Sequence, residues 1–204
     1  MGDTYCRMRG TFIVIEGIDG SGKTTLAERL ASGKDAWLTA EPTKGALGRM
    51  LRSGELGDVP PAAEALLFAA DRAIHTAEIE RELAKGRWVI CDRYAGSTVA
   101  YQSASMEGNA DWDWLNSMQK HSVIQPDAVV LLDMDPEESM ARVGSRGEEL
   151  SRFEKLEFQR RVRKAYLDLA QQFNYIVIDA ARPPEDVYRD VVSELQSRGI
   201  DASE

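Results

Sequence analysis

The stretch that decides the fold reads Gly17-Ile18-Asp19-Gly20-Ser21-Gly22-Lys23-Thr24. Its form is Gly, four residues and then Gly-Lys-Thr, and it stands between an apolar run and a helical pattern. The glycines allow a tight turn whose N–H groups converge on phosphate oxygens, and the following helix adds its positive end. Lys23 would reach the β- and γ-phosphates, and the Thr24 hydroxyl would bind Mg²⁺. A chance glycine-rich turn would not need this context. The stretch therefore predicts a nucleoside triphosphate site without choosing among kinase, GTPase and ATPase.

Five short apolar runs predict the strands of a parallel sheet. Most are continuous rather than alternating, which is typical of strands buried on both faces. Helix-like segments separate them, the longest expected over 61–85 and another from 151, where Ser151 to Glu154 spells a capping box. Alternating strands and helices predict an α/β fold, with helices on both faces of a five-stranded parallel sheet. The predicted strands are 11–16, 36–39, 88–91, 128–132 and 175–178.

The composition is that of an ordinary globular protein. The 204 residues are 43% apolar and 29% charged, and no apolar run approaches the length of a membrane span. A net charge of −9 argues against general nucleic-acid binding. Two cysteines, Cys6 and Cys91, favour a reducing, cytoplasmic location. We expect residues 1–9 to form a loose tail and residues 10–204 to form a single domain.

A charged pair follows the third predicted strand. Asp92 and Arg93 would stand at its carboxyl end, where open α/β sheets bind ligands. Asp92 can hold Mg²⁺ through water, and Arg93 can hold a second phosphate with two parallel hydrogen bonds. An ion pair that only closes the strand end is an equally good interpretation of these two residues alone.

Basic residues cluster at 142–164, which hold eight Lys or Arg residues and four Glu residues. Such a run is usually a solvated helix face. Here Arg142 and Arg146 are one helical turn apart beside glycines, as a closing phosphate clamp requires. We expect a poorly packed segment at about 140–152 that is either a solvated loop or a mobile lid.

The helix expected at 61–85 has two distinct sides. Its apolar stripe is expected to face the core and consists of Leu66, Leu67, Ala70, Ala73, Ile74 and Ala77. Phe68 and Arg72 lie four residues apart on the opposite side. Phe68 either packs under a loop or forms a base-stacking platform with the Arg72 guanidinium beside it.

Together these residues resemble the thymidylate (dTMP) kinase family of the P-loop kinases, along almost the whole chain. The ordered combination is more specific than the phosphate loop alone. It implies transfer of a phosphoryl group from Mg·ATP to dTMP, which gives dTDP and ADP for dTTP biosynthesis. The motifs are Phe12-Ile13-Val14-Ile15-Glu16-Gly17, Glu41-Pro42, Leu67-Phe68-Ala69-Ala70-Asp71-Arg72, Asp92-Arg93-Tyr94, Ser97-Thr98-Val99-Ala100-Tyr101-Gln102 and Arg152-Phe153-Glu154.

The resemblance implies a site for the acceptor. Phe68 would stack on thymine, and Arg72 would bond its O4 edge. Arg93 would hold the monophosphate, Asp19 would meet the sugar 3′-hydroxyl or the monophosphate, and Tyr101 under the deoxyribose would disfavour a 2′-hydroxyl. The implied dTMP-binding residues are Asp19, Glu41, Phe68, Arg72, Arg93, Thr98 and Tyr101. The chain departs from the family's bacterial pattern around Glu41, since Ala40 precedes it and Thr43-Lys44-Gly45 follows Pro42.

On the donor side, the resemblance implies that residues 17–24 bind ATP and that Thr24 and Asp92 hold Mg²⁺. No general base is needed, because the attacking group is already a phosphate oxygen. Some family members carry an arginine in the loop, where this chain has Gly20, so the chain resembles those that bring arginines from a lid. The implied catalytic residues are Lys23, Arg93, Arg142, Arg146 and Arg152. The family further implies the strand order 2-3-1-4-5 and a homodimer.

Two other functions fit the same residues. One is a kinase on this scaffold for deoxynucleosides or another nucleoside monophosphate, which a comparison of dTMP, dCMP, AMP and thymidine as acceptors would separate. The other is a nucleotide-binding regulatory protein without catalysis. The presence of Lys23, Thr24 and Asp92 argues against it.

Overall fold

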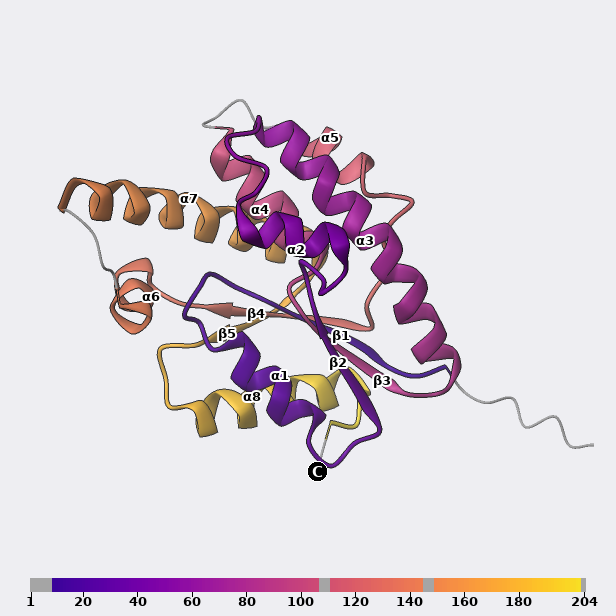
Figure 1. The fold of residues 1–204 in the computed structure, drawn as a ribbon. Coiled ribbons are helices and arrows are strands. Elements are labelled where there is room, and N and C mark those ends of the chain that lie inside the picture. Colours follow the sequence, from indigo (N-terminus) through magenta and orange to yellow (C-terminus); the bar gives the residue numbers. More distant parts are fainter. Residues whose placement is uncertain (1–8, 107–110, 145–148, 203–204) are drawn as a thin grey trace, which may run out of the picture.

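Five parallel strands form one sheet in the order β2-β3-β1-β4-β5 (Figure 1). The structure is a computed structural model that describes residues 9–106, 111–144 and 149–202, with the backbone alone for 149–154. The predicted strand order is therefore confirmed, and each predicted strand end is correct to within one residue. The strands are β1 (Phe12–Glu16), β2 (Ala36–Ala40), β3 (Trp88–Asp92), β4 (Ala128–Asp133) and β5 (Ile176–Asp179).

Helices cover both faces of the sheet, as predicted. Figure 1 shows α1 and α8 on one face and α2, α3, α4, α5 and α7 on the other. The described helices are α1 (Lys23–Ala31), α2 (Ala46–Ser53), α3 (Pro61–Ala84), α4 (Ala95–Ser105), α5 (Trp112–Ser117), α6 (Pro136–Val143), α7 (Glu149–Phe173) and α8 (Pro184–Ser197). In the part of the chain that the structure describes, no helix is long and apolar enough to cross a membrane.

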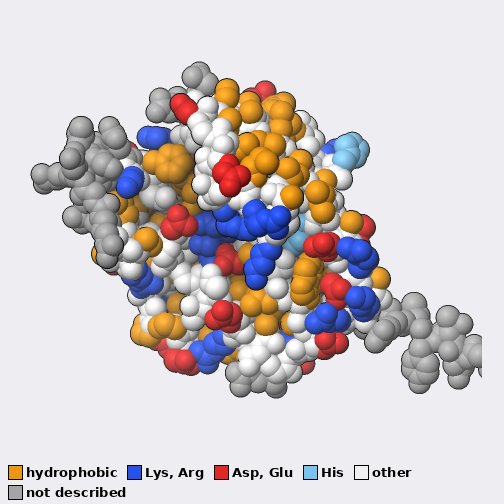
Figure 2. All heavy atoms as spheres, in the orientation of Figure 1, with side chains coloured by type: hydrophobic (Ala, Val, Ile, Leu, Met, Phe, Trp, Pro, Cys, Tyr) orange, Lys and Arg blue, Asp and Glu red, His pale blue; other side chains and the backbone are white. Residues whose placement is uncertain are grey.

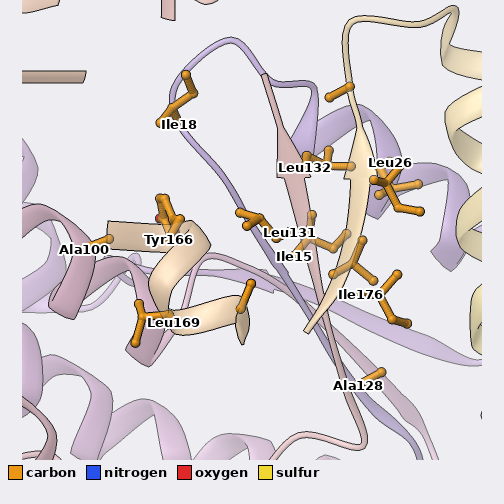
Figure 3. Packing of buried hydrophobic residues seen from close by; sticks show 14 of the residues in the cluster. Ile15, Ile18, Leu26, Ala100, Ala128, Leu131, Leu132, Tyr166, Leu169 and Ile176 are labelled. Atoms are coloured by element: carbon orange, nitrogen blue, oxygen red, sulfur yellow. The ribbon is translucent and has the colours of Figure 1, made fainter. Parts of the chain in front are cut away.

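The core follows from the central position of β1. Every residue of β1 is buried, including Glu16, because strands and helices enclose it on all sides. Ile15 belongs to a buried cluster with Leu131 and Leu132 of β4, Ile176 of β5 and Leu26 of α1 (Figure 3). The other side of β1 packs against Ile79 and Leu83 of α3. Because side chains pack against both faces of β1, the position of this strand is fixed. The position of the loop that follows it, residues 17–22, is fixed as well.

The prediction for the apolar stripe of α3 is wrong. Leu66 and Ile74 are 53% and 60% exposed, and Figure 2 shows the apolar surface that results over α3. The side chains that α3 buries are Ala65, Ala69, Asp71, Arg72, His75, Ile79 and Leu83. The reason is that the polar members of this set make buried hydrogen bonds, which apolar periodicity does not reveal.

Two helix boundaries differ from the predictions. Helix α7 begins at Glu149, so Ser151 lies inside the helix and does not cap it. Helix α6 continues to Val143, so the expected loop or lid at 140–152 is helical at both ends, and residues 145–148 lie outside the described residues. On α7, Val162, Tyr166 and Leu169 are buried, Leu156 is partly buried and Phe173 is exposed.

The predicted N-terminal tail lies outside the described residues except for Arg9. That residue belongs to the fold, because its guanidinium contacts the Asp127 carboxylate at 3.0 Å. The Asp127 carboxylate also accepts the backbone N–H of Phe12 at 2.7 Å. Arg9 is therefore tied to the start of β1.

Strand β5 offers a direct test of the sheet's burial. Ile176 is 3% exposed and its neighbour Val177 is 47% exposed. We expect Ile176→Ala to lower the free energy of unfolding by about 2–5 kcal/mol, because it leaves a cavity. Val177→Ala should cost less than about 1 kcal/mol. Urea denaturation of both variants measures the difference, and equal losses would show that Ile176 is not a core residue.

Candidate active site

The candidate site lies where three neighbouring strands end. Strand β3 is hydrogen-bonded to both β1 and β2, with Asp92 in register with Ile15 and Ala40. Parallel strands that end together bring the residues after them to one edge of the sheet. The phosphate loop after β1, Glu41 after β2 and Arg93 after β3 therefore meet there.

The phosphate loop has the backbone geometry that its glycines allow. Gly20 and Gly22 have positive φ angles of 76° and 91°, which other residues rarely adopt. Lys23 is buried, and its ammonium group donates to the Ile18 carbonyl at 2.7 Å. Burial, and secondarily the charge of Arg93, lower the pKa of Lys23 to about 8. The buried Ser21 hydroxyl has no hydrogen-bond partner among the described residues. The loop thus places the Lys23 ammonium group and the Ser21 hydroxyl where they can bind an anion.

Helix α6 packs against this loop and explains Gly20. The Ser139 hydroxyl of α6 donates to the Asp19 carbonyl. A Cβ atom on Gly20 would lie 2.9 Å from the Ser139 carbonyl oxygen and 2.9 Å from a Val143 methyl carbon. Any side chain here would displace α6, so a loop arginine is excluded by packing as well as by its positive φ.

Thr24 and Asp92 form a pair of oxygen ligands. The Thr24 hydroxyl donates to Asp92 Oδ2 at 2.6 Å, and Asp92 Oδ1 is buried without a hydrogen-bond partner in the described structure. Carboxylate and hydroxyl oxygens are ligands that Mg²⁺ prefers, with phosphates and waters completing its shell. The described residues contain no cluster of three or more His, Cys, Asp or Glu side chains suited to a metal. The pair therefore fits a metal held jointly with a nucleotide.

Arg93 is held in one conformation by four elements. Its φ is 71°, an unusual value for a residue with a side chain, and its N–H donates to the Ile15 carbonyl at 2.9 Å. Its guanidinium contacts the Asp19 carboxylate at 2.5 Å and the hydroxyls of Tyr101 and Tyr166 at 3.1 and 3.4 Å. Loop, strand, α4 and α7 thus fix where this positive charge lies.

A fully buried carboxylate lies behind Arg93. Glu16 accepts the backbone N–H groups of Tyr94 and Ser97, both at 3.1 Å, and the Ser97 hydroxyl at 2.5 Å. Burial raises the pKa of Glu16. The same Ser97 hydroxyl accepts from Arg93 at 3.3 Å. Glu16 therefore anchors the first turn of α4, which carries the groups around Arg93.

Two cavities open on this edge. One, of about 540 Å³, lies over the phosphate loop, and the other, of about 330 Å³, lies between α3 and α4. They share Asp19, Glu41, Pro42 and Arg93 as lining residues. Figure 2 shows Lys and Arg side chains gathered in the middle of this face, beneath the apolar surface of α3. Two anionic ligands in these cavities would meet at Arg93.

The second cavity brings together the residues predicted for the acceptor base. Phe68 and Tyr101 line it, and Gln102 contributes a buried amide oxygen without a hydrogen-bond partner among the described residues. The predictions did not assign a role to Gln102, although it ends a quoted motif. Only the structure shows that its amide is buried at this cavity.

Arg72 is fully buried at the back of the same cavity. Its Nε donates to Glu41 at 2.8 Å, and its Nη2 donates to the Thr98 hydroxyl at 2.8 Å and to the Tyr94 carbonyl at 3.2 Å. One Nη1 hydrogen goes to the Gln119 amide oxygen. A guanidinium has five N–H donors, so the contacts among the described residues leave one Nη1 hydrogen for a ligand.

Arg52 is a basic residue of the phosphate cavity that the sequence did not single out. It lines this cavity together with Lys23 and Arg93. Its guanidinium donates to the Thr43 carbonyl at 2.6 Å, and Asp71 accepts the Thr43 hydroxyl and N–H, both at 2.7 Å. These hydrogen bonds fix the loop around Thr43, where the sequence departs from the bacterial pattern of the family. The helix that carries Arg52 lies outside the quoted motifs, so no sequence signal pointed to it.

The predicted lid arginines are placed only in part. Arg142 lines the phosphate cavity, and its guanidinium donates to the carbonyls of Ala180 and Ala181 at 3.1 and 3.2 Å. Arg146 lies outside the described residues, as does the side chain of Arg152, whose backbone belongs to α7.

Comparisons with known proteins agree with this geometry. The family model for thymidylate kinase matches residues 15–191. The chain is 43% identical to the probable thymidylate kinase of Pyrobaculum calidifontis, over 91% of this chain and 95% of the relative. It is 41% identical to the probable thymidylate kinase of Methanocaldococcus jannaschii, over 91% and 96% of the two chains. The solved structure of thymidylate kinase from Candida albicans superposes with a TM-score of 0.81 at 26% identity, over 96% of this chain and 94% of that one.

The family model covers the phosphate loop and the residues that line both cavities, and the relatives match along nearly their whole length. The chain therefore belongs to the thymidylate kinase family, the nucleoside monophosphate kinases that transfer a phosphoryl group to dTMP.

Proposed function

We propose that the two adjoining cavities hold the two substrates of the dTMP kinase reaction. ATP places its phosphates over residues 17–24, and dTMP enters the cavity between α3 and α4. The observation that carries this assignment is that the two cavities adjoin, because Arg93 and Asp19 line both of them. A monophosphate bound at Arg93 then faces the γ-phosphate above Lys23.

The base is recognised at the closed end of the second cavity. Phe68 supplies a flat face on which thymine stacks, with Tyr101 under the deoxyribose. Thymine presents O4 as an acceptor and N3–H as a donor. The remaining Nη1 hydrogen of Arg72 suits O4, and the unpaired amide oxygen of Gln102 suits N3–H. Thr98, held by Arg72, lies beside them.

Charge neutralisation carries the phosphoryl transfer. Two anionic nucleotides repel each other, and the transition state spreads negative charge over the transferring group. Lys23, Arg52, Arg93 and Arg142 line the phosphate cavity and offset this charge. No general base takes part, because the attacking oxygen of dTMP is already anionic. Arg146 and Arg152 belong to this proposal as lid arginines on the basis of sequence alone.

Thr24 and Asp92 hold the magnesium ion that accompanies ATP. The Thr24 hydroxyl can turn from Asp92 Oδ2 to the metal, and Asp92 Oδ1 has no other hydrogen-bond partner in the described structure. When bound there, Mg²⁺ would neutralise negative charge on the phosphates of ATP.

The exposed stripe of α3 is proposed as the surface of a homodimer. Leu66 and Ile74 lie on it, with the exposed Ala70, Ala73 and Ala77 between and after them. Small and branched apolar residues at helical spacing allow close packing of a second copy of the same helix. Such a dimer buries the apolar surface that the single chain leaves in water, which favours association.

The first prediction from this proposed function concerns Lys23. Lys23→Ala should lower turnover by orders of magnitude, since the transferring phosphoryl group loses a fixed positive charge, while the melting temperature stays near that of the wild type. Because the pKa of Lys23 is lowered to about 8, the free enzyme loses this charge above that pH. The wild-type affinity for ATP should therefore fall as the pH rises from 8 to 10.

Isothermal titration of ATP across this range measures the effect. Lys23→Ala is the control, and its affinity should be lower and should fall less over the same range. An affinity of the wild type that does not change between pH 8 and 10 would contradict the role of Lys23.

The second prediction concerns Phe68. Phe68→Ala should weaken dTMP binding by about 1–3 kcal/mol, the range for base–aromatic stacking, and change stability little. Phe173→Ala is a matched control, because Phe173 is 48% exposed and lies outside the cavity. Equilibrium binding of dTMP and thermal melting distinguish the two roles. Unchanged dTMP affinity with a sharply lower melting temperature would make Phe68 a packing residue only.

The third prediction concerns the dimer. Ile74→Lys should convert a dimer into a monomer, because it places a charge in the apolar contact. Val177→Lys is the control, since Val177 is also exposed but lies on the edge strand β5. Light scattering after size-exclusion chromatography reports the mass of each. A wild type that is monomeric at micromolar concentration would rule out this surface.

A further inference from the structure

A buried chain of polar groups continues behind Arg72, away from the cavity. The Thr39 hydroxyl lies 2.8 Å from Nε2 of His75, and Nδ1 of His75 lies 2.9 Å from Oε1 of Glu41. The other oxygen of Glu41 accepts from Nε of Arg72 at 2.8 Å, and it lies 2.7 Å from Nη2 in the same ion pair. His75 and Arg72 are each 1% exposed and Glu41 is 6% exposed. Solvent water therefore cannot replace a hydrogen-bond partner that is lost from this series of buried side chains.

The fold dictates this arrangement. Arg72 and His75 are three residues apart on α3 and share its buried face. Thr39 and Glu41 are two apart at the end of β2, so they point to the same side. The ring of Trp37 from the same strand meets the His75 ring edge to face at 5.6 Å. His75 thus has a fixed ring plane with one nitrogen toward Glu41.

The two oxygens of Glu41 have separate partners. If Arg72 alone held the carboxylate, the carboxylate could rotate about that contact. The bond from His75 fixes the plane of the carboxylate, and Glu41 then sets the orientation of the Arg72 guanidinium together with Thr98, Tyr94 and Gln119. That orientation decides where the one remaining Nη1 hydrogen points.

We propose that His75 is a positioning residue for recognition of the base of dTMP. Its Nδ1–H locks Glu41, and Glu41 aligns Arg72 so that its last N–H meets O4 of thymine. This inference rests on the proposed role of Arg72. His75 itself touches neither substrate cavity.

The chemistry identifies which nitrogen matters. An ionised carboxylate only accepts, so Nδ1 of His75 carries the proton in its bond to Glu41. Nε2 can accept from the Thr39 hydroxyl in the neutral ring. Asparagine places its amide nitrogen near the position of Nδ1, whereas glutamine places its amide nitrogen near that of Nε2. The asparagine variant can therefore keep the hydrogen bond to Glu41, whereas the glutamine variant can keep only the hydrogen bond to Thr39.

The experiment compares His75→Asn, His75→Gln and Thr39→Val with the wild type. It measures kcat and the KM values for dTMP and ATP well below each melting midpoint. It also measures the preference for dTMP over dCMP, which presents an amino donor in place of O4. His75→Gln should raise the KM for dTMP about 10-fold or more and reduce that preference, while the KM for ATP changes less than about twofold. His75→Asn should stay within about threefold of the wild type, and Thr39→Val should leave both KM values unchanged.

Two outcomes would overturn the inference. In one, His75→Asn and His75→Gln raise both KM values alike, in proportion to the loss of melting temperature, which makes His75 structural only. In the other, His75→Gln leaves the KM for dTMP and the preference over dCMP unchanged. An Arg72→Lys variant tests the underlying assignment separately. If Arg72→Lys binds dTMP normally, the proposed role of Arg72 in binding the base is wrong, whatever the His75 variants show. If Arg72→Lys raises the KM for dTMP but the His75 variants behave like the wild type, only the positioning role of His75 is refuted.

Discussion

The site depends on one constraint, the parallel register of β2, β3 and β1. Because these neighbouring strands end together, three segments far apart in sequence meet at one edge of the sheet. Each contributes a different group, namely the phosphate loop, the carboxylate of Glu41 and the guanidinium of Arg93. The packing that fixes β1 in the core is thus also what fixes the position of Lys23 relative to Arg93. A shift of one strand would separate Lys23 from Arg93 and leave two anions unscreened.

Buried charges transmit this constraint to the ligands. A charge inside a protein is costly unless it is paired, and removing one partner of a buried pair costs about 3–5 kcal/mol. Glu41 is such a partner of Arg72, whereas the buried Glu16 is linked to Arg93 through the Ser97 hydroxyl. The two arginines are therefore placed before any nucleotide arrives. Pre-organised charge of this kind stabilises a transition state without a cost of rearrangement at the moment of reaction.

The sequence predicted the elements whose signal is local. Continuous apolar runs located the strands, and the spacing of Gly17, Gly22 and Lys23 located the phosphate loop. The predictions that failed depend on partners distant in sequence. The stripe of Leu66 and Ile74 was assigned to the core because periodicity shows that a helix has an apolar face but not which neighbour covers it.

The site residues follow the same division. Phe68, Arg72 and Arg93 were predicted because they stand in recognisable motifs, Arg93 directly after β3 and the other two on α3. Arg52 was missed because its role depends on the fold of the loop between β2 and α2. His75 was missed because a lone histidine on a helix gives no signal until Glu41 lies beside it. Burial of polar groups on α3 is a tertiary effect, and it reversed the amphipathic prediction for that helix.

The most direct measurement is a crystal structure of the enzyme with Mg²⁺, dTMP and a non-hydrolysable ATP analogue. It should show thymine on Phe68 with O4 within hydrogen-bond distance of Arg72. The monophosphate should contact Arg93, in line with the γ-phosphate above Lys23, and the metal should lie against Thr24 and Asp92. A dTMP phosphate bound away from Arg93, or a base outside the cavity between α3 and α4, would contradict the assignment of the two cavities.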